Sequence, residues 1–309
     1  MKLHLAWPVS VAAAALVLAG CSSNDSGSGE ESSTSSSASE TSTSAAAAPS
    51  PEVEKAAVDY KAYAVGQIDE LVGAVKVLTD AVRANNLQAA QDAYAPSRMP
   101  WERIEPLAGL VEHIDGKVDS RVDDFSGEDD PAFTGWHRLE FLLFNKNTTE
   151  GGAPVADQLD KDIAELKTQF ADVEVTPLDV ANGAAELIEE VSEGKITGEE
   201  DRYSKTDLWD FDANLQGSQA AIDKLTPALE KADPALLGKI DGGISQVYDT
   251  LAPLRRGDGW VLFCPENDEF PSPRCPAVTV TPEVVDKLKA QLAGLSENLS
   301  EVAGVLKLQ

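Results

Sequence analysis

Helix-start signals in front of long amphipathic segments constrain the fold of this chain most strongly. A proline at the first helical position loses no hydrogen bond, and a Ser, Thr or Asp before it can accept from the free backbone amides of the first turn. Four residue pairs have this form: Ser50-Pro51, Thr176-Pro177, Asp233-Pro234 and Thr281-Pro282. Helix starts are therefore spread along the chain from residue 50 onward.

Apolar residues recur at helical spacing behind these starts and in two further segments. We expect helices over 51–84, 153–171, 177–193, 206–231, 235–254 and 282–307. Thr197 followed by Glu200 has the spacing of a capping box, and clear strand-like runs occur at 260–263 and 277–280 alone. The pattern predicts an all-α protein built from helix bundles, with a break between two halves where turn-forming residues cluster at 147–154.

The first fifty residues have the composition of an export signal and a tether. Residues 1–20 contain the short apolar run VAAAALVLA, and the small residues before Cys21 resemble a bacterial lipobox. Because the run is too short for a stable membrane span, we expect a signal peptide over 1–20 and lipidation of Cys21, with palmitate among the acyl chains. A plain secretory signal with a chance cysteine is the alternative.

Residues 21–50 are mostly Ser, Thr, Ala, Gly and Glu. Such a segment cannot bury enough apolar surface to offset its ordering entropy, so it predicts a disordered, lipid-anchored linker. Residues 51–309 are then the folded domain, held at the cell membrane on its extracytoplasmic (periplasmic or cell-surface) side.

Cys264 and Cys275 flank the proline-rich stretch CPENDEFPSPRC. Outside the cytosol two such cysteines most often pair, so we expect a disulfide. A metal site is the weaker alternative, since the sequence places no further Cys or His nearby.

The chain carries 53 acidic and 25 basic residues, which gives a formal net charge of −28. This charge repels nucleic acid and anionic lipid headgroups, so neither is an expected partner, and it attracts cations weakly. Solubility alone is the simpler explanation of the acidity.

Acidic residues recur at helical spacing in three short stretches. Glu102 and Glu105 are three residues apart, Asp115 and Asp119 four apart, and His137 and Glu140 three apart, so each pair shares one helix face. Buried carboxylates cannot converge without a cation or protons, and one imidazole with several carboxylates suits iron, manganese or zinc. The alternatives are solvated helix faces and an ordinary core histidine.

Four stretches in register together resemble the imelysin-like family: "YAPSRMPWERIEPLA" (94–108), "IDGKVDSRVDD" (114–124), "GWHRLEFLL" (135–143) and "GKITGEEDRYSKTDLWDFDANLQG" (194–217). The resemblance covers roughly residues 55–309. It implies two pseudo-repeated four-helix bundles and a surface lipoprotein that binds iron (Fe2+ or Fe3+, with Zn2+ or Mn2+ as alternatives). It also implies two partners, a membrane iron permease and a haem peroxidase-like protein.

The family's motifs carry over to named positions of this chain. The implied metal ligands are Glu102, Glu105, Asp119, His137 and Glu140, with Asp115 and Asp123 in reserve and Arg121 orienting the acids. A possible second metal site comprises Glu199, Glu200, Asp201, Asp207 and Asp210. Lys205 stands where relatives usually carry a histidine, which favours a structural role for that segment, with Trp209 and Phe211 in the core.

The resemblance implies a transport component that captures iron and passes it to the permease, and not an enzyme. A metal-dependent peptidase is one alternative, but a zinc peptidase commonly needs two histidines on one helix. His113 is the only other histidine in the chain after the predicted signal peptide. A polysaccharide-binding surface protein is the other alternative, and the net charge disfavours a polyanionic ligand.

Overall fold

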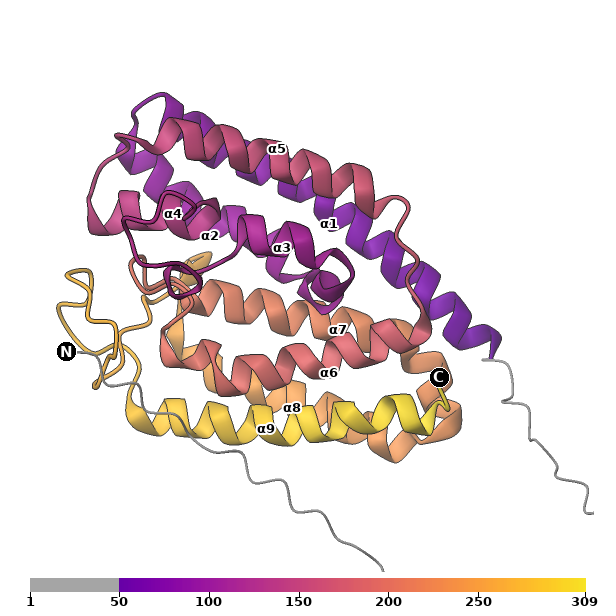
Figure 1. Cartoon of the computed structure of the whole chain (residues 1–309). Coiled ribbons are helices and arrows are strands. Elements are labelled where there is room, and N and C mark those ends of the chain that lie inside the picture. The colour runs from indigo at the N-terminus through magenta and orange to yellow at the C-terminus, as the bar shows by residue number, and fades with distance from the viewer. Residues whose placement is uncertain (1–49) are drawn as a thin grey trace, which may run out of the picture. The chain divides into compact units, whose positions relative to one another are not determined.

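The computed structural model describes residues 50–309; the predicted signal peptide, Cys21 and nearly all of the predicted linker lie outside the described residues. The long helices are α1 (Pro51–Arg83), α2 (Leu87–Glu102), α5 (Gly152–Phe170), α6 (Pro177–Glu193), α7 (Asp207–Ala232), α8 (Pro234–Leu251) and α9 (Pro282–Val305). The short ones are η1 (Glu105–Val111), α3 (Glu112–Val118), η2 (Val122–Asp124), α4 (Gly135–Glu140), η3 (Phe141–Asn145), η4 (Lys195–Thr197) and η5 (Ala252–Leu254). The all-α prediction is confirmed (Figure 1).

All six predicted helices are present, and their ends agree with the prediction to within three residues. Asp233 accepts hydrogen bonds from the amides of Ala235 and Leu236, and Thr176 forms a capping box with Asp179. The other two predicted caps, Ser50 and Thr281, make no such side-chain bond within the described chain. Proline at the first position is therefore the more reliable of the two start signals here.

The capping box predicted at Thr197 and Glu200 is wrong. Thr197 ends η4, and its hydroxyl donates to the carbonyl of Gly194 at 2.7 Å. Gly198 then adopts a left-handed conformation (φ 84°), which stops the helix. Glu200 is free to point inward, away from any helix terminus.

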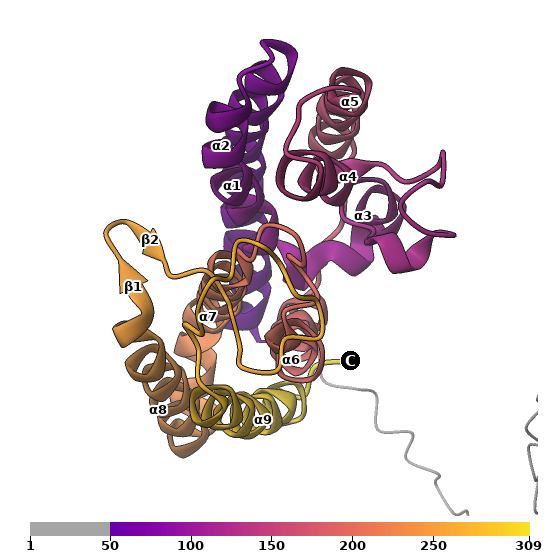
Figure 2. The same cartoon turned by 90° about the vertical axis from the view of Figure 1, so that its left-hand side faces the viewer.

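The helices form two groups (Figures 1 and 2). Helices α1, α2 and α5, with the short α3 and α4, make one group, and α6 to α9 make the other. Helix α7 packs against α1 and α2, and one continuous apolar core serves both groups. Residues 147–154 only connect η3 to α5 inside the first group, so the break expected there is not a boundary; the chain crosses between groups at 171–176.

Two glycines allow the segment around η1 to approach the second group closely. A Cβ atom on Gly183 of α6 would lie 1.9 Å from the carbonyl oxygen of Pro106, and one on Gly217 of α7 would lie 2.3 Å from that of Arg103. No other residue fits these contacts without displacing the backbone. This close packing brings η1 against α6 and α7, and the end of α2, with Glu102, against α7.

Strand structure is confined, within the described region, to the segment before α9. β1 (Arg255–Arg256) pairs with β2 (Gly259–Trp260), and Pro265 pairs with Val280 in a single bridge. The strands predicted at 260–263 and 277–280 are therefore largely wrong. The amide of Phe263 bonds to the Lys205 carbonyl in a turn, and the amides of Thr279 and Val280 share the single carbonyl of Cys264. Cys264 and Cys275, the pair expected from the sequence, are joined by a disulfide.

Among residues 50–309, none of the helices combines the length and the apolar character needed to cross a membrane.

Candidate metal centre

His137 and Glu140 lie on α4, a helix buried on nearly every side. Gly135 begins this helix with φ 74°, and a Cβ there would clash with the Val118 carbonyl at 2.3 Å. The side chain of His137 is 2% exposed and that of Glu140 about 1%. His137 Nδ1 lies 3.2 Å from Glu140 Oε2, so the two groups face each other.

Both ends of this pair have further polar partners. Glu140 Oε1 accepts from the backbone amides of Tyr203 and Ser204, at 2.8 and 2.7 Å. On the other side, His137 Nε2 lies 3.3 Å from Asp119 Oδ1 and 3.7 Å from Glu200 Oε1. The imidazole is therefore surrounded by carboxylates from three separate segments.

Arg98 of α2 lies at the middle of these acids. Its side chain is fully buried and contacts Glu200 at 2.9 Å and Asp210 at 3.0 Å, and it also pairs with Glu102 and Asp119. Asp201 lies 3.9 Å from it as well, and one guanidinium cannot balance five carboxylates. We give the name buried carboxylate cluster to the residues around Arg98 and His137: Glu102, Asp119, His137, Glu140, Glu200, Asp201 and Asp210.

Three sets of side chains in this cluster have ligand atoms within 4.8 Å of one another. They are Asp119, His137 and Glu200; His137, Glu140 and Asp201; and Glu102, Glu200 and Asp210. Each set is buried or nearly so, and His137 and Glu200 each belong to two of them. Three converging ligands of this type are typical of transition-metal sites in proteins.

Burial and neighbouring charges shift the proton affinities of the cluster in opposite directions. Burial would raise the pKa of Asp119, but Arg98 and His137 beside it hold that pKa well below its usual range. Burial and Arg98 would lower the pKa of His137, but hydrogen bonds to Asp119 and Glu140 raise it well above 6.5. The metal-free cluster thus favours an imidazolium paired with carboxylates.

Two other carboxyls of the cluster retain protons more readily. Burial, and next the charge of Glu140, raise the pKa of Asp201 to about 6. Burial raises the pKa of Asp210 well above its usual range despite the neighbouring Arg98. Within residues 50–309, Asp210 Oδ1 also has no hydrogen-bond partner. The cluster therefore has unused capacity to coordinate a cation.

A family model described as Imelysin, which is named as a peptidase family, matches residues 56–301. The chain belongs to the imelysin family. It is 43% identical over 254 residues to the "Iron uptake system component EfeO" of Escherichia coli O157:H7, and 42% identical to the proteins of that name from Escherichia coli K12 and Shigella flexneri. Each match covers 82% of this chain and 64% of the relative, so the chain spans just under two thirds of these relatives' length.

The imelysin family assignment confirms the resemblance inferred from the four motifs, and the structure shows how those motifs meet. Four of the five ligands that the first motifs implied, Glu102, Asp119, His137 and Glu140, lie in the cluster. Glu105 does not; Lys195 Nζ binds its two oxygens at 2.6 and 2.8 Å.

The reserve ligands of this imelysin domain lie apart from the cluster. Asp115 lies on the wall of the neighbouring cavity, and Asp123 pairs with Arg202 at the surface.

The segment predicted as a separate second site contributes to the same cluster. Glu200, Asp201 and Asp210 point to Arg98 or His137, so the imelysin domain has one acidic centre there and not two. Glu199 lies 3.9 Å from Arg121, and Asp207 accepts from the amide of Asp201. Lys205 Nζ binds Asp268. Three acids of the segment thus face the cluster and two do not, and whether any of them binds a metal stays a prediction.

Two cations of the imelysin domain were missed from the sequence. Arg98 stands four residues before Glu102, a spacing that could have flagged it as the partner of that acid. Lys195 gave no local signal, because it reaches Glu102 and Glu105 from another helix group. Arg121 does bind Glu200, at 2.9 Å, as the sequence suggested.

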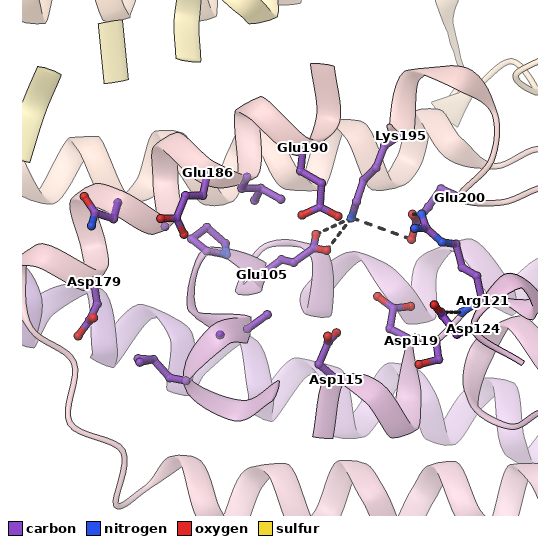
Figure 3. A pocket seen from close by; sticks show the side chains of 18 residues that line it. Glu105, Asp115, Asp119, Arg121, Asp124, Asp179, Glu186, Glu190, Lys195 and Glu200 are labelled. Atoms are coloured by element: carbon purple, nitrogen blue, oxygen red, sulfur yellow. Dashed lines mark hydrogen bonds and ion pairs between the residues drawn. The ribbon is translucent and has the colours of Figure 1, made fainter. Parts of the chain in front are cut away.

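A cavity of about 570 Å³ adjoins the cluster in this imelysin domain, and we call it the vestibule. Acidic side chains predominate among the charged groups on its walls; they are Glu105, Asp115, Asp119, Asp124, Asp179, Glu186, Glu190 and Glu200. Figure 3 shows Lys195 between Glu105 and Glu200, with Asp115 and Asp119 on the opposite wall. Burial, and next the charge of Asp119, raise the pKa of Asp115 to about 7. The vestibule is thus an acidic passage that ends at the cluster.

Proposed function

We propose that this imelysin-family protein binds iron at the buried carboxylate cluster and serves as the metal-binding component of an iron uptake system. The convergence of His137 with carboxylates from α2, α3, α4, the 198–206 segment and α7 carries the proposal. The relatives are named as components of an iron uptake system, which supports the same class of function.

The ligand types favour a transition metal. Imidazole with carboxylates suits Fe(II) and Fe(III), and Zn(II) or Mn(II) are the alternatives, whereas Ca(II) prefers an all-oxygen shell. We place the ion at His137, in one of the two ligand sets that share it: with Asp119 and Glu200 on the Nε2 side of the imidazole, or with Glu140 and Asp201 on the Nδ1 side. The acidic vestibule supplies the entry route, because its charge concentrates cations near the cluster.

The proposed role is capture and transfer without bond breaking. The ion would pass to a membrane iron permease, with a haem peroxidase-like protein as a further partner and a lipid on Cys21 as the anchor outside the cytoplasm. A peptidase role has less support: His113, the other histidine in the described region, lies at the surface and bonds to Gln169 at 2.5 Å. The acidic vestibule likewise disfavours a polyanionic polysaccharide.

Anaerobic calorimetry with Fe(II) tests the proposal on the purified full chain. We expect saturable binding that is lost in a His137→Ala, Glu140→Gln variant, because the imidazole and the carboxylate charge are both removed. Gln is chosen at 140 because its side-chain oxygen can still accept from the Tyr203 and Ser204 amides. The control is His113→Ala, Glu112→Gln, which removes the same two groups from the surface of α3. Equal binding by the site variant, with its helical circular dichroism intact, would contradict the proposal.

A further inference from the structure

We propose that the loop closed by the disulfide, residues 264–275, positions the metal ligands by holding the turn of residues 201–206. We call these segments the disulfide loop and the site turn. The effect on metal binding rests on the proposed function, whereas the positioning of the turn rests on contacts within the protein. Neither the family assignment nor the proposed function gives the loop a role.

The site turn makes direct contact with two ligands of the cluster. The amides of Tyr203 and Ser204 both donate to Glu140 Oε1, which fixes the orientation of that carboxylate toward His137. Asp201 belongs to the turn and shares a ligand set with His137 and Glu140. Thr206 donates to Asp201 Oδ2 from the other end of the turn. A displacement of the turn would therefore move one carboxylate and release another.

The backbone of the site turn needs external support. Lys205 has φ 61°, a left-handed conformation that is unfavourable for a residue with a long side chain. Its side chain is fully buried, although an ammonium is costly to remove from water. Such a conformation persists only where surrounding contacts fix it.

The disulfide loop and the residue before it supply those contacts. Three successive carbonyls of the turn accept hydrogen bonds: Tyr203 from Ser272 Oγ at 3.3 Å, Ser204 from the Arg274 guanidinium, and Lys205 from the Phe263 amide at 2.8 Å. Asp268, inside the loop, binds the buried Lys205 ammonium at 2.8 Å. The turn is thus held on one side by the loop and on the other by Glu140.

The disulfide fixes the loop in this position. Cys264 is buried next to Phe263, and its carbonyl accepts from the Thr279 amide at 2.9 Å. Cys275 directly follows Arg274, so the covalent bond anchors both ends of the segment that contacts the turn. Without the bond, the loop gains conformational freedom that the native contacts must then overcome.

The test compares two loop variants with the wild-type full chain. Cys264→Ser, Cys275→Ser removes the cross-link, and Asp268→Asn removes the partner of Lys205 without touching the disulfide. The matched control is Glu52→Gln, which breaks an exposed ion pair with Lys231. If the cysteine variant fails to fold, Asp268→Asn still tests the inference. Asp268→Glu keeps a carboxylate for Lys205 and should show wild-type hydrogen exchange and metal affinity.

Hydrogen exchange gives the first readout and needs no metal. We expect the amides of Tyr203 and Ser204 to exchange at least tenfold faster in both loop variants, with helical circular dichroism retained and the control unchanged. Unchanged exchange at these amides would overturn the inference.

Fe(II) affinity and the visible spectrum of bound Co(II), which reports ligand geometry, give the second readout. Loss of groups that orient metal ligands typically weakens metal affinity about 10- to 100-fold, and we expect that range with an altered Co(II) spectrum. Wild-type affinity and spectrum in both variants would overturn the inference. Faster exchange in the variants, combined with a wild-type chain that binds no metal, would refute the proposed function and leave the positioning role established.

Discussion

Replacing Arg98 with methionine tests the electrostatics of the cluster most directly. The guanidinium is fully buried and pairs with five carboxylates, while Met keeps most of the side-chain volume. Breaking a buried ion pair costs about 3–5 kcal/mol, because the remaining charge is uncompensated. In a domain of this size 1 kcal/mol changes Tm by about 2–4 °C, so we expect Arg98→Met to lower Tm by about 6–20 °C at pH 8.

The destabilisation should depend on pH and on metal. Without Arg98, the folded-state pKa of the facing carboxylates lies above their unfolded value of about 4. Groups shifted in this direction contribute stability at low pH that is lost as pH rises. The Tm deficit of Arg98→Met should therefore be smaller at pH 5 than at pH 8. A bound dication would replace the missing charge, so metal should raise the Tm of the variant more than that of the wild type.

Thermal unfolding followed by circular dichroism, with and without Mn(II) at both pH values, measures these effects. Arg256→Met is the control, because Arg256 is exposed and contacts only backbone carbonyls of its own turn. A Tm of Arg98→Met within about 2 °C of the wild type at pH 8 would refute the argument, since it would mean that the carboxylates need no internal cation. Equal stabilisation of both proteins by metal would refute the argument that a bound dication replaces the charge of Arg98.

Two further predictions concern the vestibule. Lys195→Met removes an ammonium that binds Glu102 and lies 4.0 Å from Glu200, a proposed ligand. Calorimetry should therefore show metal affinity about tenfold higher, on the scale of one hydrogen bond to a charged group, and unchanged affinity would contradict this. Burial raises the pKa of Asp115 to about 7, so ionising it costs folded-state stability as pH rises from about 4 to 7. Asp115→Asn should match the wild type in Tm near pH 4 and exceed it at pH 8, and an equal Tm at both values would exclude a raised pKa.

The helices were predictable because their signals are local. A proline after a capping residue and apolar residues at helical spacing determine where a helix begins and which face it buries, whatever lies opposite. The capping box at Thr197 failed because Gly198 ends the helical turn and Glu200 gains more from Arg98 than from a helix terminus. The strand prediction also failed because of a contact distant in sequence: the Phe263 amide bonds to the Lys205 carbonyl and not to another strand.

The site was predictable only in its sequence-local pairs. His137 with Glu140 and the position of Asp119 followed from spacing and from the family motifs. The convergence of both predicted groups of acids in one cluster did not, because it depends on how α7 and the 198–206 segment pack against α2 and α4. Glu105 was expected in the metal shell from the family motif, and nothing in the sequence indicates that Lys195 binds it.

The internal cations explain how the buried carboxylate cluster can be stable when no metal ion is bound. Buried carboxylates without a counter-charge would destabilise the empty protein, and Arg98 and Lys195 supply that charge. Arg98 pairs with the proposed ligands Asp119 and Glu200, and Lys195 lies 4.0 Å from Glu200, so an ion bound there would have to displace these contacts. Affinity is thereby lower than the number of carboxylates alone would give. Under the proposed role, in which iron passes to a partner, this reduction favours release, whereas a storage site or a resident catalytic metal would not require it.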